Sequence, residues 1–325
     1  MTEFDAIARL AQQADFPALC SETLRQVSSL GGDVRVELLE AFDERGGTPG
    51  AMELEHWVVR RFSDGIEIDR PAWLARAAPK VPAGEQIPRV RTTDPAGHVL
   101  CLGSLAGVWR FLAIEGQLVP GGLRRITRLC AIFRHLLAMI DRFERDALTG
   151  LLNRQSFDYR FEELLERHRQ NPRRARVGTM PWLAIADIDH FKRINDTYGH
   201  LYGDEILLLF SRLMHQNFRS DDLLFRYGGE EFVLILNNTT AQGALRALER
   251  FRESIGNYAF PTVGRVTVSI GWVCVQPQAL PSDLMHRADK ALYHSKGNGR
   301  NQVTSYEATF GEHEVEPQQS AVDLF

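Results

Sequence analysis

The stretch Arg226-Tyr-Gly-Gly-Glu-Glu-Phe232 decides the fold of the second half of this chain. Runs rich in β-forming residues flank it, at 222–227 and 232–236, so the two glycines predict a tight hairpin. Glycine has no side chain, and a bulky anionic group could therefore approach the backbone at this turn. Glu230 and Glu231 follow the glycines at once and bring two carboxylates to the end of a strand.

A second stretch, Asp187-Ile-Asp-His-Phe-Lys192, lies earlier in the chain. It follows the apolar run Trp182–Ala186, which predicts a buried strand that ends at Asp187. Carboxylates from two strand ends, brought together, form a hard oxygen site suited to Mg²⁺, or Mn²⁺, carrying substrate phosphates. A metal beside a turn that is open to phosphate predicts nucleotidyl or phosphoryl transfer.

The composition is that of a globular protein with room for two domains. Hydrophobic residues make up 44% and charged residues 25% of the 325 residues, which is ordinary for soluble chains. The net charge of −4 argues against broad nucleic-acid binding. No signal peptide is visible, and no apolar run approaches the roughly 18 residues that cross a bilayer. We therefore expect a cytoplasmic protein whose scattered cysteines are buried thiols: Cys20, Cys101, Cys130 and Cys274.

Residues 1–118 are expected to form a sensory domain for an unknown small-molecule or protein signal. The sequence predicts helices over 3–13 and up to Leu30, a short helix near Trp73–Arg76, and strands at Val34–Phe42, Met52–Phe62, His98–Leu102 and Gly107–Ile114. This order resembles a GAF-type domain, with the PAS fold as the alternative. His56, His98 and Cys101 could suggest haem or metal, but ordinary core or surface positions explain them better.

Residues 119–145 predict a helical linker. Apolar residues recur at alternating spacings of three and four, which is a heptad pattern: Ile126, Leu129, Phe133, Leu136, Ile140, Phe143 and Ala147. One interpretation is a parallel coiled-coil stalk that pairs two chains. The alternative is an amphipathic helix packed on its own sensory domain.

Several further motifs follow in a fixed order: Asp146-Ala-Leu-Thr-Gly-Leu-Leu-Asn-Arg154, Asn195-Asp-Thr-Tyr-Gly-His200, Gly203-Asp204 and Lys296-Gly-Asn-Gly-Arg300. With the two stretches above, they make residues 146–305 resemble the GGDEF domain of diguanylate cyclases, in a Gly-Gly-Glu-Glu-Phe variant. The resemblance implies an α/β fold similar to the palm of nucleotide cyclases and polymerases, with a mostly antiparallel five-stranded sheet flanked by helices. The acidic tail, residues 306–325, is predicted to be disordered.

The resemblance also implies roles at the catalytic centre. Asp187, the backbone carbonyl of Ile188 and Glu230 would hold the metal, and two carboxylates beside Gly228 and Gly229 would repel each other without a cation. Glu231 would support a second metal or polarise the attacking hydroxyl. Asp189 is ambiguous, because it could equally orient neighbouring backbone.

Substrate contacts are implied in the same way. Asn195 and Asp204 would recognise guanine, since a carboxylate accepts from the two donors that adenine lacks. Taken alone, Asn195 could be a turn cap and Asp204 a helix N-cap. Lys192, Lys296 and Arg300 would hold the β- and γ-phosphates, although cations near a helix C-terminus also have a simple dipole explanation.

Arg219-Ser-Asp-Asp222 matches the inhibitory site of the family, where the product cyclic di-GMP docks, and Arg250 occupies the position of a secondary arginine there. The whole pattern implies a diguanylate cyclase that condenses two GTP molecules in a homodimer and is inhibited by its product. One alternative is a degenerate domain that binds nucleotide without catalysis. Another is an enzyme that makes mixed cyclic GMP-AMP, against which Asp204 argues.

Overall fold

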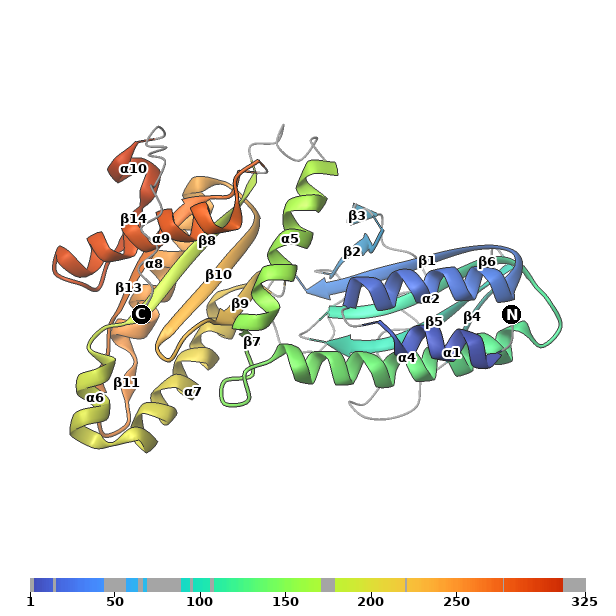
Figure 1. Cartoon of the computed structure of the whole chain (residues 1–325), viewed down its shortest axis with the longest axis horizontal. Helices are drawn as coiled ribbons and strands as arrows, with labels where there is room; N and C mark the ends of the chain where they lie inside the picture. The colour runs from blue at the N-terminus through green and yellow to red at the C-terminus, as the bar shows by residue number, and fades with distance from the viewer. Residues whose placement is uncertain are drawn as a thin grey trace, which may run out of the picture. The chain divides into compact units, whose positions relative to one another are not determined.

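The structure is a computed structural model that describes residues 3–13, 16–43, 57–63, 67–68, 89–93, 96–105, 108–170, 179–219, 221–276 and 278–311. The chain divides into two compact units (Figure 1). The first consists of Met1–Pro172 with Met214–Leu223, and the second of Arg173–Leu213 with Leu224–Phe325. Among the described residues, none of the helices has the length and apolar character needed to cross a membrane.

An antiparallel sheet forms the centre of the first unit, with strand order β3-β2-β1-β6-β5-β4. Its strands are β1 (Gly32–Asp43), β2 (Trp57–Arg61), β3 (Glu67–Ile68), β4 (Arg89–Thr93), β5 (Ala96–Leu105) and β6 (Val108–Leu118). The four predicted strands are therefore confirmed where they are described. The short strands β3 and β4 are additional, because runs of two and five residues show too little periodicity to detect. The helix expected near Trp73 and the residue His56 lie outside the described residues.

Three helices share one hydrophobic core with this sheet. They are α1 (Glu3–Ala11), α2 (Phe16–Gly31) and α4 (Gly122–Glu144), close to the predicted helices. Along β1 and β6 the residues that enter this core alternate, with Leu38 on β1 and with Leu112 and Ile114 on β6. The cysteines Cys20 and Cys130 are buried in the same core, and burial raises the pKa of the Cys130 thiol to about 12.

The heptad face of α4 is used within the chain. Ile126, Leu129, Phe133 and Ile140 are buried in the core of the first unit, and Leu136 packs against it. Phe143, in contrast, is 75% exposed. A stalk paired through this seam would have to remove those four side chains from the core. The packing therefore corresponds to the amphipathic-helix alternative rather than to a coiled coil.

A row of buried charges crosses the same sheet. Glu40 on β1 lies directly opposite Arg60 on β2 and Arg110 on β6, and forms ion pairs of 2.8 Å with Arg60 Nε and 3.2 Å with Arg110 Nη2. Burial is the main cause that lowers the pKa of Arg110 below its usual value, and Glu40 opposes this shift. Glu40 is thus paired on both sides across the sheet, while Arg110 Nε is buried without a hydrogen-bond partner among the described residues.

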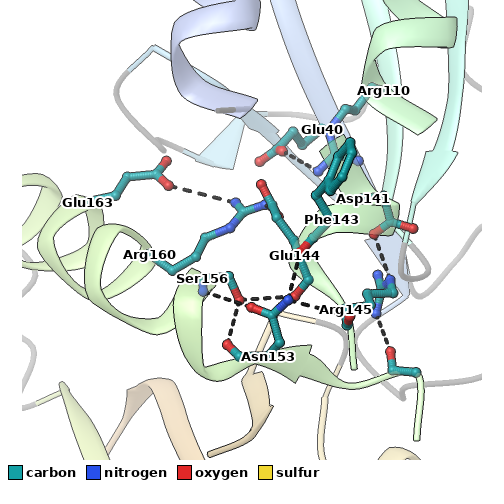
Figure 2. Close-up of polar contacts among 11 residues, drawn as sticks. Glu40, Arg110, Asp141, Phe143, Glu144, Arg145, Asn153, Ser156, Arg160 and Glu163 are labelled. Atoms are coloured by element: carbon teal, nitrogen blue, oxygen red, sulfur yellow. Dashed lines mark hydrogen bonds and ion pairs between the residues drawn. The ribbon is translucent and has the colours of Figure 1, made fainter. Parts of the chain in front are cut away.

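A second buried ion pair fixes the end of α4. Glu144, the last residue of that helix, pairs with Arg160 on α5 (Arg154–Gln170), with 2.6 Å between Oε2 and Nη2. Figure 2 shows the side chains of Glu144 and Arg160. It also shows Ser156, whose Oγ donates to the backbone oxygen of Glu144. Asn153, on β7 (Leu152–Asn153), donates to the backbone oxygen of Phe143. The turn between α4 and α5 is therefore held by several polar contacts at once.

The second unit is an α/β structure whose strands pair in the order β14-β13-β8-β10-β9. They are β14 (Val303–Ser305), β13 (Val268–Cys274), β8 (Met180–Ile188), β10 (Glu231–Thr239) and β9 (Leu223–Arg226). The pairs of β8 with β10 and β13 are antiparallel, and β13 with β14 is parallel. A separate small hairpin joins β11 (Ala259–Phe260) to β12 (Gly264–Arg265). The expectation of a mostly antiparallel sheet is confirmed for these pairs.

Helices cover both faces of this sheet (Figure 1). On one face the ring of Phe210 of α7 (His200–Asn217) packs in a tilted arrangement on Phe232 of β10 and edge-to-face on Phe251 of α8 (Ala241–Asn257). On the other, α9 (Pro281–Gly297) packs so closely on β13 that a Cβ at Gly271 would lie 2.1 Å from the backbone nitrogen of Leu292. Asp187 lies on the same face of the sheet as Gly271, the face that α9 covers. Asp187 is paired with Ser269 on β13, and Ser269 and Gly271 are two residues apart and therefore share a face.

The acidic tail begins with an ordered helix, which corrects the expectation of disorder for its first residues. Residues Tyr306–Phe310 form α10, capped by Ser305, whose hydroxyl accepts from the backbone nitrogen of Ala308. Tyr306 is buried, and Lys290 of α9 lies 4.6 Å from the ring centroid of Phe310. The aromatic packing outweighs the unfavourable composition here, since one turn is docked on α9. Residues 312–325 lie outside the described part of the chain.

Candidate functional site

The predicted carboxylates meet where three strands of the second unit end. In the register of the sheet, Asp187 on β8 lies opposite both Glu231 on β10 and Ser269 on β13. The apolar run that precedes Asp187 is buried throughout, because β8 is the central strand and both of its faces are covered. The strand therefore delivers its terminal acid to a fixed place, beside the hairpin that carries the second carboxylate pair.

Asp187 is 4% exposed, and its Oδ2 lies 2.8 Å from the Nζ of Lys296. Burial raises the pKa of Asp187 above its usual value, Lys296 opposes this shift, and Glu231 and Asp189 add to it. The sequence predicts only a contact between Lys296 and substrate phosphate. The structure instead shows its ammonium group paired with the predicted metal ligand.

Glu230 shares this electrostatic environment. Burial, followed by the negative charge of Asp187, raises the pKa of Glu230 above its usual value, and Lys296 opposes the shift. The ionised form of each of these two neighbouring acids is unfavourable in the folded protein. A bound cation would offset that cost. The hairpin is closed by the backbone nitrogens of Tyr227 and Gly228, which both donate to the backbone oxygen of Glu231. A Cβ at Gly228 would lie 2.8 Å from Glu231 Oε2, so a side chain there would displace the end of the exposed Glu231 side chain.

The residues present fit a divalent cation only as an open site. Within the described residues, no three His, Cys, Asp or Glu side chains gather as a metal cluster. Asp187 and Glu230 would supply two carboxylates, and the carbonyl of Ile188, waters and substrate phosphates would have to complete the coordination. Mg²⁺ is usually held in this way, by one or two carboxylates and the substrate.

The predicted guanine contacts lie on two consecutive helices. Asn195 is on α6 (Phe191–Tyr198), and its Oδ1 is buried without a hydrogen-bond partner among the described residues. Asp204 lies exposed inside α7, next to Gly203. Neither residue is a helix cap, so the simpler alternatives for both are wrong. An orphaned buried acceptor beside an exposed acid fits a ligand that offers N–H donors, as the guanine edge does.

Gly203 makes room for that acceptor. A Cβ built at Gly203 would lie 1.9 Å from Asn195 Oδ1 and 3.3 Å from the ring of Phe191. No side chain can therefore be added at Gly203 without moving Asn195. Sequence reasoning grouped Gly203 with Asp204 but did not identify this contact, which depends on how α6 and α7 pack.

The other predicted phosphate cations are solvent-exposed. Lys192 stands in the first turn of α6, and Arg300 follows α9 in a left-handed conformation with φ of 64°. The structure brings Lys296 to the carboxylates, while Lys192 and Arg300 lie on the elements that border them. Their phosphate roles remain predictions.

Asp189 is the site residue whose place the sequence left open. It is 4% exposed and accepts three hydrogen bonds: from Thr267 Oγ1 at 2.7 Å, Ser269 Oγ at 2.7 Å and the backbone nitrogen of Asn301 at 3.1 Å. Its own backbone nitrogen donates to the oxygen of Thr267. These contacts support the structural interpretation of Asp189, as an anchor for neighbouring backbone.

The predicted inhibitory residues fall in different units. Arg219 and Asp222 belong to the first, where the carboxylate of Asp222 accepts from the backbone nitrogen of Arg219 at 2.9 Å. The side chain of Arg219 is exposed. Arg250 is exposed on α8, in the second unit. Asp222 thus already has a local role in closing a turn.

Comparison with known proteins matches residues 143–302 to the family described as diguanylate cyclase, GGDEF domain. The probable diguanylate cyclase DgcT of Escherichia coli is 38% identical over 184 residues, which are 54% of this chain and 38% of that protein. The diguanylate cyclase DgcM of the same species is 41% identical over 166 residues, covering 49% and 37%. The chain thus spans under two fifths of the length of these relatives.

Solved structures match the same half. The GGDEF domain of DgcB from Caulobacter crescentus, in complex with c-di-GMP, is 34% identical with a TM-score of 0.47, covering 50% of this chain and 96% of that one. Its longer form with the coiled coil is 31% identical with a TM-score of 0.49, covering 57% and 96%.

Proposed function

We propose that this chain, which belongs to the GGDEF family of diguanylate cyclase domains through residues 143–302, condenses two GTP molecules into cyclic di-GMP and releases two pyrophosphates. The observation that carries the proposal is the meeting of Asp187 with the Gly-Gly-Glu-Glu hairpin at adjacent strand ends. Their shared burial and raised pKa values favour a cation at that place. Relatives named as diguanylate cyclases support the same activity.

Each residue of the centre has a task in this reaction. The 3′-hydroxyl of one GTP attacks the α-phosphorus of the other, a new P–O bond forms, and pyrophosphate leaves. A bound Mg²⁺ supplies charge neutralisation at the phosphates. Asp187 and Glu230 would hold that ion, with Glu231 near the attacking hydroxyl. Lys296 would exchange its contact with Asp187 for substrate phosphate, which brings a cation to the site without a large movement of the backbone.

The reaction also needs a second copy of the chain. One domain binds one GTP, so the two reacting nucleotides must come from facing sites in a homodimer. The heptad face of α4 is buried within the chain, and therefore we assign the dimer contact to no particular surface. For residues 1–118 we propose a GAF-like sensory role, supported by the antiparallel sheet and its three helices. We also propose that the protein acts in the cytoplasm.

The direct test is to incubate the purified chain with GTP and Mg²⁺ and separate the nucleotides by chromatography. We expect cyclic di-GMP with two pyrophosphates per product molecule, no product with ATP, and loss of synthesis when EDTA removes the metal. Binding of GTP without any turnover would instead identify a nucleotide-binding module.

The packing of Gly203 gives a prediction about guanine recognition. In Gly203→Ala the new methyl group must displace the Asn195 amide, and a displacement of this size lowers kcat/KM for GTP by about 100-fold. Gly256→Ala on α8 is the matched control, because the nearest atoms to a Cβ there lie 3.9 and 4.0 Å away, which is ordinary van der Waals contact. Steady-state kinetics with both variants test this, and equal values for the two would contradict a role for Gly203.

We further propose feedback inhibition by product bound at Arg219, Asp222 and Arg250. Arg219→Ala removes a charged donor, which is worth about 1.5–3 kcal/mol, so the cyclic di-GMP concentration for half-inhibition should rise by at least about tenfold. Arg246→Ala changes another exposed arginine on α8 and should leave inhibition unchanged. Inhibition curves of the three proteins provide the measurement, and superimposable curves would exclude Arg219 from the site.

A further inference from the structure

The turn after α9 carries Arg300, follows directly on Lys296 in the last turn of that helix, and has an unusual backbone. Gly299, Arg300 and Asn301 have positive φ values of 105°, 64° and 47°. Two consecutive non-glycine residues in the left-handed region are strained, and such strain persists only where surrounding contacts over-determine the conformation. Something in the second unit must therefore hold this turn in place.

Several contacts hold it, including one from Gln302 Nε2 to the backbone oxygen of Asn298 at 2.9 Å, and three others bear on Arg300 and Asn301. The backbone nitrogen of Arg300 donates to the oxygen of Ser295 at 3.0 Å, which keeps the turn on the end of α9. Arg252 of α8 donates to the Asn301 side chain at 3.1 Å. The third contact comes from the catalytic strand, because Asp189 Oδ2 accepts the backbone nitrogen of Asn301 at 3.1 Å.

Asp189 is well placed to fix the position of this turn through its hydrogen bonds, rather than to act through its negative charge. Its other oxygen accepts from Ser269 of β13 and its backbone nitrogen donates to Thr267, which directly precedes that strand, so the carboxylate cannot rotate freely. It lies two residues after Asp187 in the chain. One short segment thus carries the proposed metal ligand Asp187 and, two residues later, the side chain that bonds to the turn after Lys296.

We propose that Asp189 is a positioning residue that fixes the turn from Lys296 to Arg300 relative to Asp187, and thereby sets the place of the triphosphate. This proposal rests on the proposed function, since it takes GTP as the ligand. Asp189 binds neither metal nor nucleotide; it acts through the backbone of Asn301. The shape of its side chain therefore matters more than its negative charge.

Two substitutions separate shape from charge. Asp189→Asn keeps the shape, because the amide oxygen can accept from Thr267 and Asn301 while the amide nitrogen donates to the rotatable Ser269 hydroxyl. Asp189→Glu keeps the charge but lengthens the side chain and pushes the turn away. A positioning role predicts that Asn is tolerated and Glu is not. A metal ligand or purely electrostatic role predicts the reverse.

The experiment measures KM and kcat for GTP in both variants, together with binding of a fluorescent GTP analogue at saturating Mg²⁺. We expect Asp189→Glu to raise KM and weaken analogue binding by at least about tenfold, as second-layer changes do, with a much smaller change in kcat. Asp189→Asn should stay within about threefold of the wild type in both measurements. Thr240→Ala removes the α8 N-cap and serves as a control for lost stability without a displaced turn.

A variant with Asn that loses tenfold or more, or a variant with Glu that behaves as the wild type, overturns the proposal. If the Glu variant does not fold, the Asn variant alone decides in the same way. The binding measurement separates this proposal from the proposed cyclase activity. If the wild-type chain binds the analogue but makes no cyclic di-GMP, the activity is contradicted, and the binding data of the variants still decide the role of Asp189.

Discussion

Glu230→Ala is expected to reduce cyclic di-GMP synthesis by at least about 100-fold, which is the usual cost of removing a group that stabilises transition-state charge. The protein should fold normally. Burial and the charge of Asp187 raise the pKa of Glu230, so the ionised side chain is electrostatically unfavourable in the folded state. Removing it relieves repulsion, and the melting temperature should be unchanged or slightly higher.

The measurement is product formation beside a thermal melt. Glu230→Gln keeps the size of the side chain and removes its charge, and it should lose activity to a similar extent because the ligand must be anionic. Glu253→Ala, an exposed glutamate on α8, is the control for loss of an acidic residue. Substantial turnover in Glu230→Ala would show that the metal ion is held elsewhere.

Arg160→Met should be the most destabilising of the proposed variants. Arg160 and Glu144 are 14% and 7% exposed. Burial by itself lowers the pKa of Arg160, but the attraction of Glu144 and Glu163 outweighs it and raises the pKa above its usual value. Methionine leaves Glu144 buried without its cation, and breaking a buried pair from one side costs about 3–5 kcal/mol.

Urea unfolding of the wild type and the variant gives this difference. The same helix supplies a matched control, because Arg169 pairs with Glu166 at 3.6 Å with both side chains about half exposed. Arg169→Met should cost less than about 1 kcal/mol. Similar losses for the two variants would mean that the Glu144–Arg160 pair is hydrated in solution. Adding Glu144→Met to Arg160→Met should recover part of the stability, since it removes the one buried charge that Arg160→Met leaves unpaired.

Local sequence signals predicted the strand end and the hairpin that carry the proposed catalytic carboxylates. An apolar run that stops at Asp187 and a Gly-Gly turn followed by Glu230 are local signals, because strand burial and hairpin geometry depend on neighbouring residues. The structure confirms β8 and β10 at these places and pairs them in register.

Only the tertiary structure decided how distant segments are joined. Asp189 bonds to residues 78, 80 and 112 positions away, and such bonds leave no periodic pattern in the sequence. The partner of Lys296 and the crowding of Gly203 against Asn195 depend on helix packing in the same way.

The helix α4 shows most clearly what the sequence pattern could not determine. A heptad pattern reports that one face is buried but not which surface buries it, because a second chain and the chain's own sheet exclude water equally well. Ile126 and Phe133 are buried in the core of their own unit, a choice that depends on the sheet and helices packed around them. The proposed site residues could therefore be predicted from the sequence, while the contacts that support them required the folded molecule.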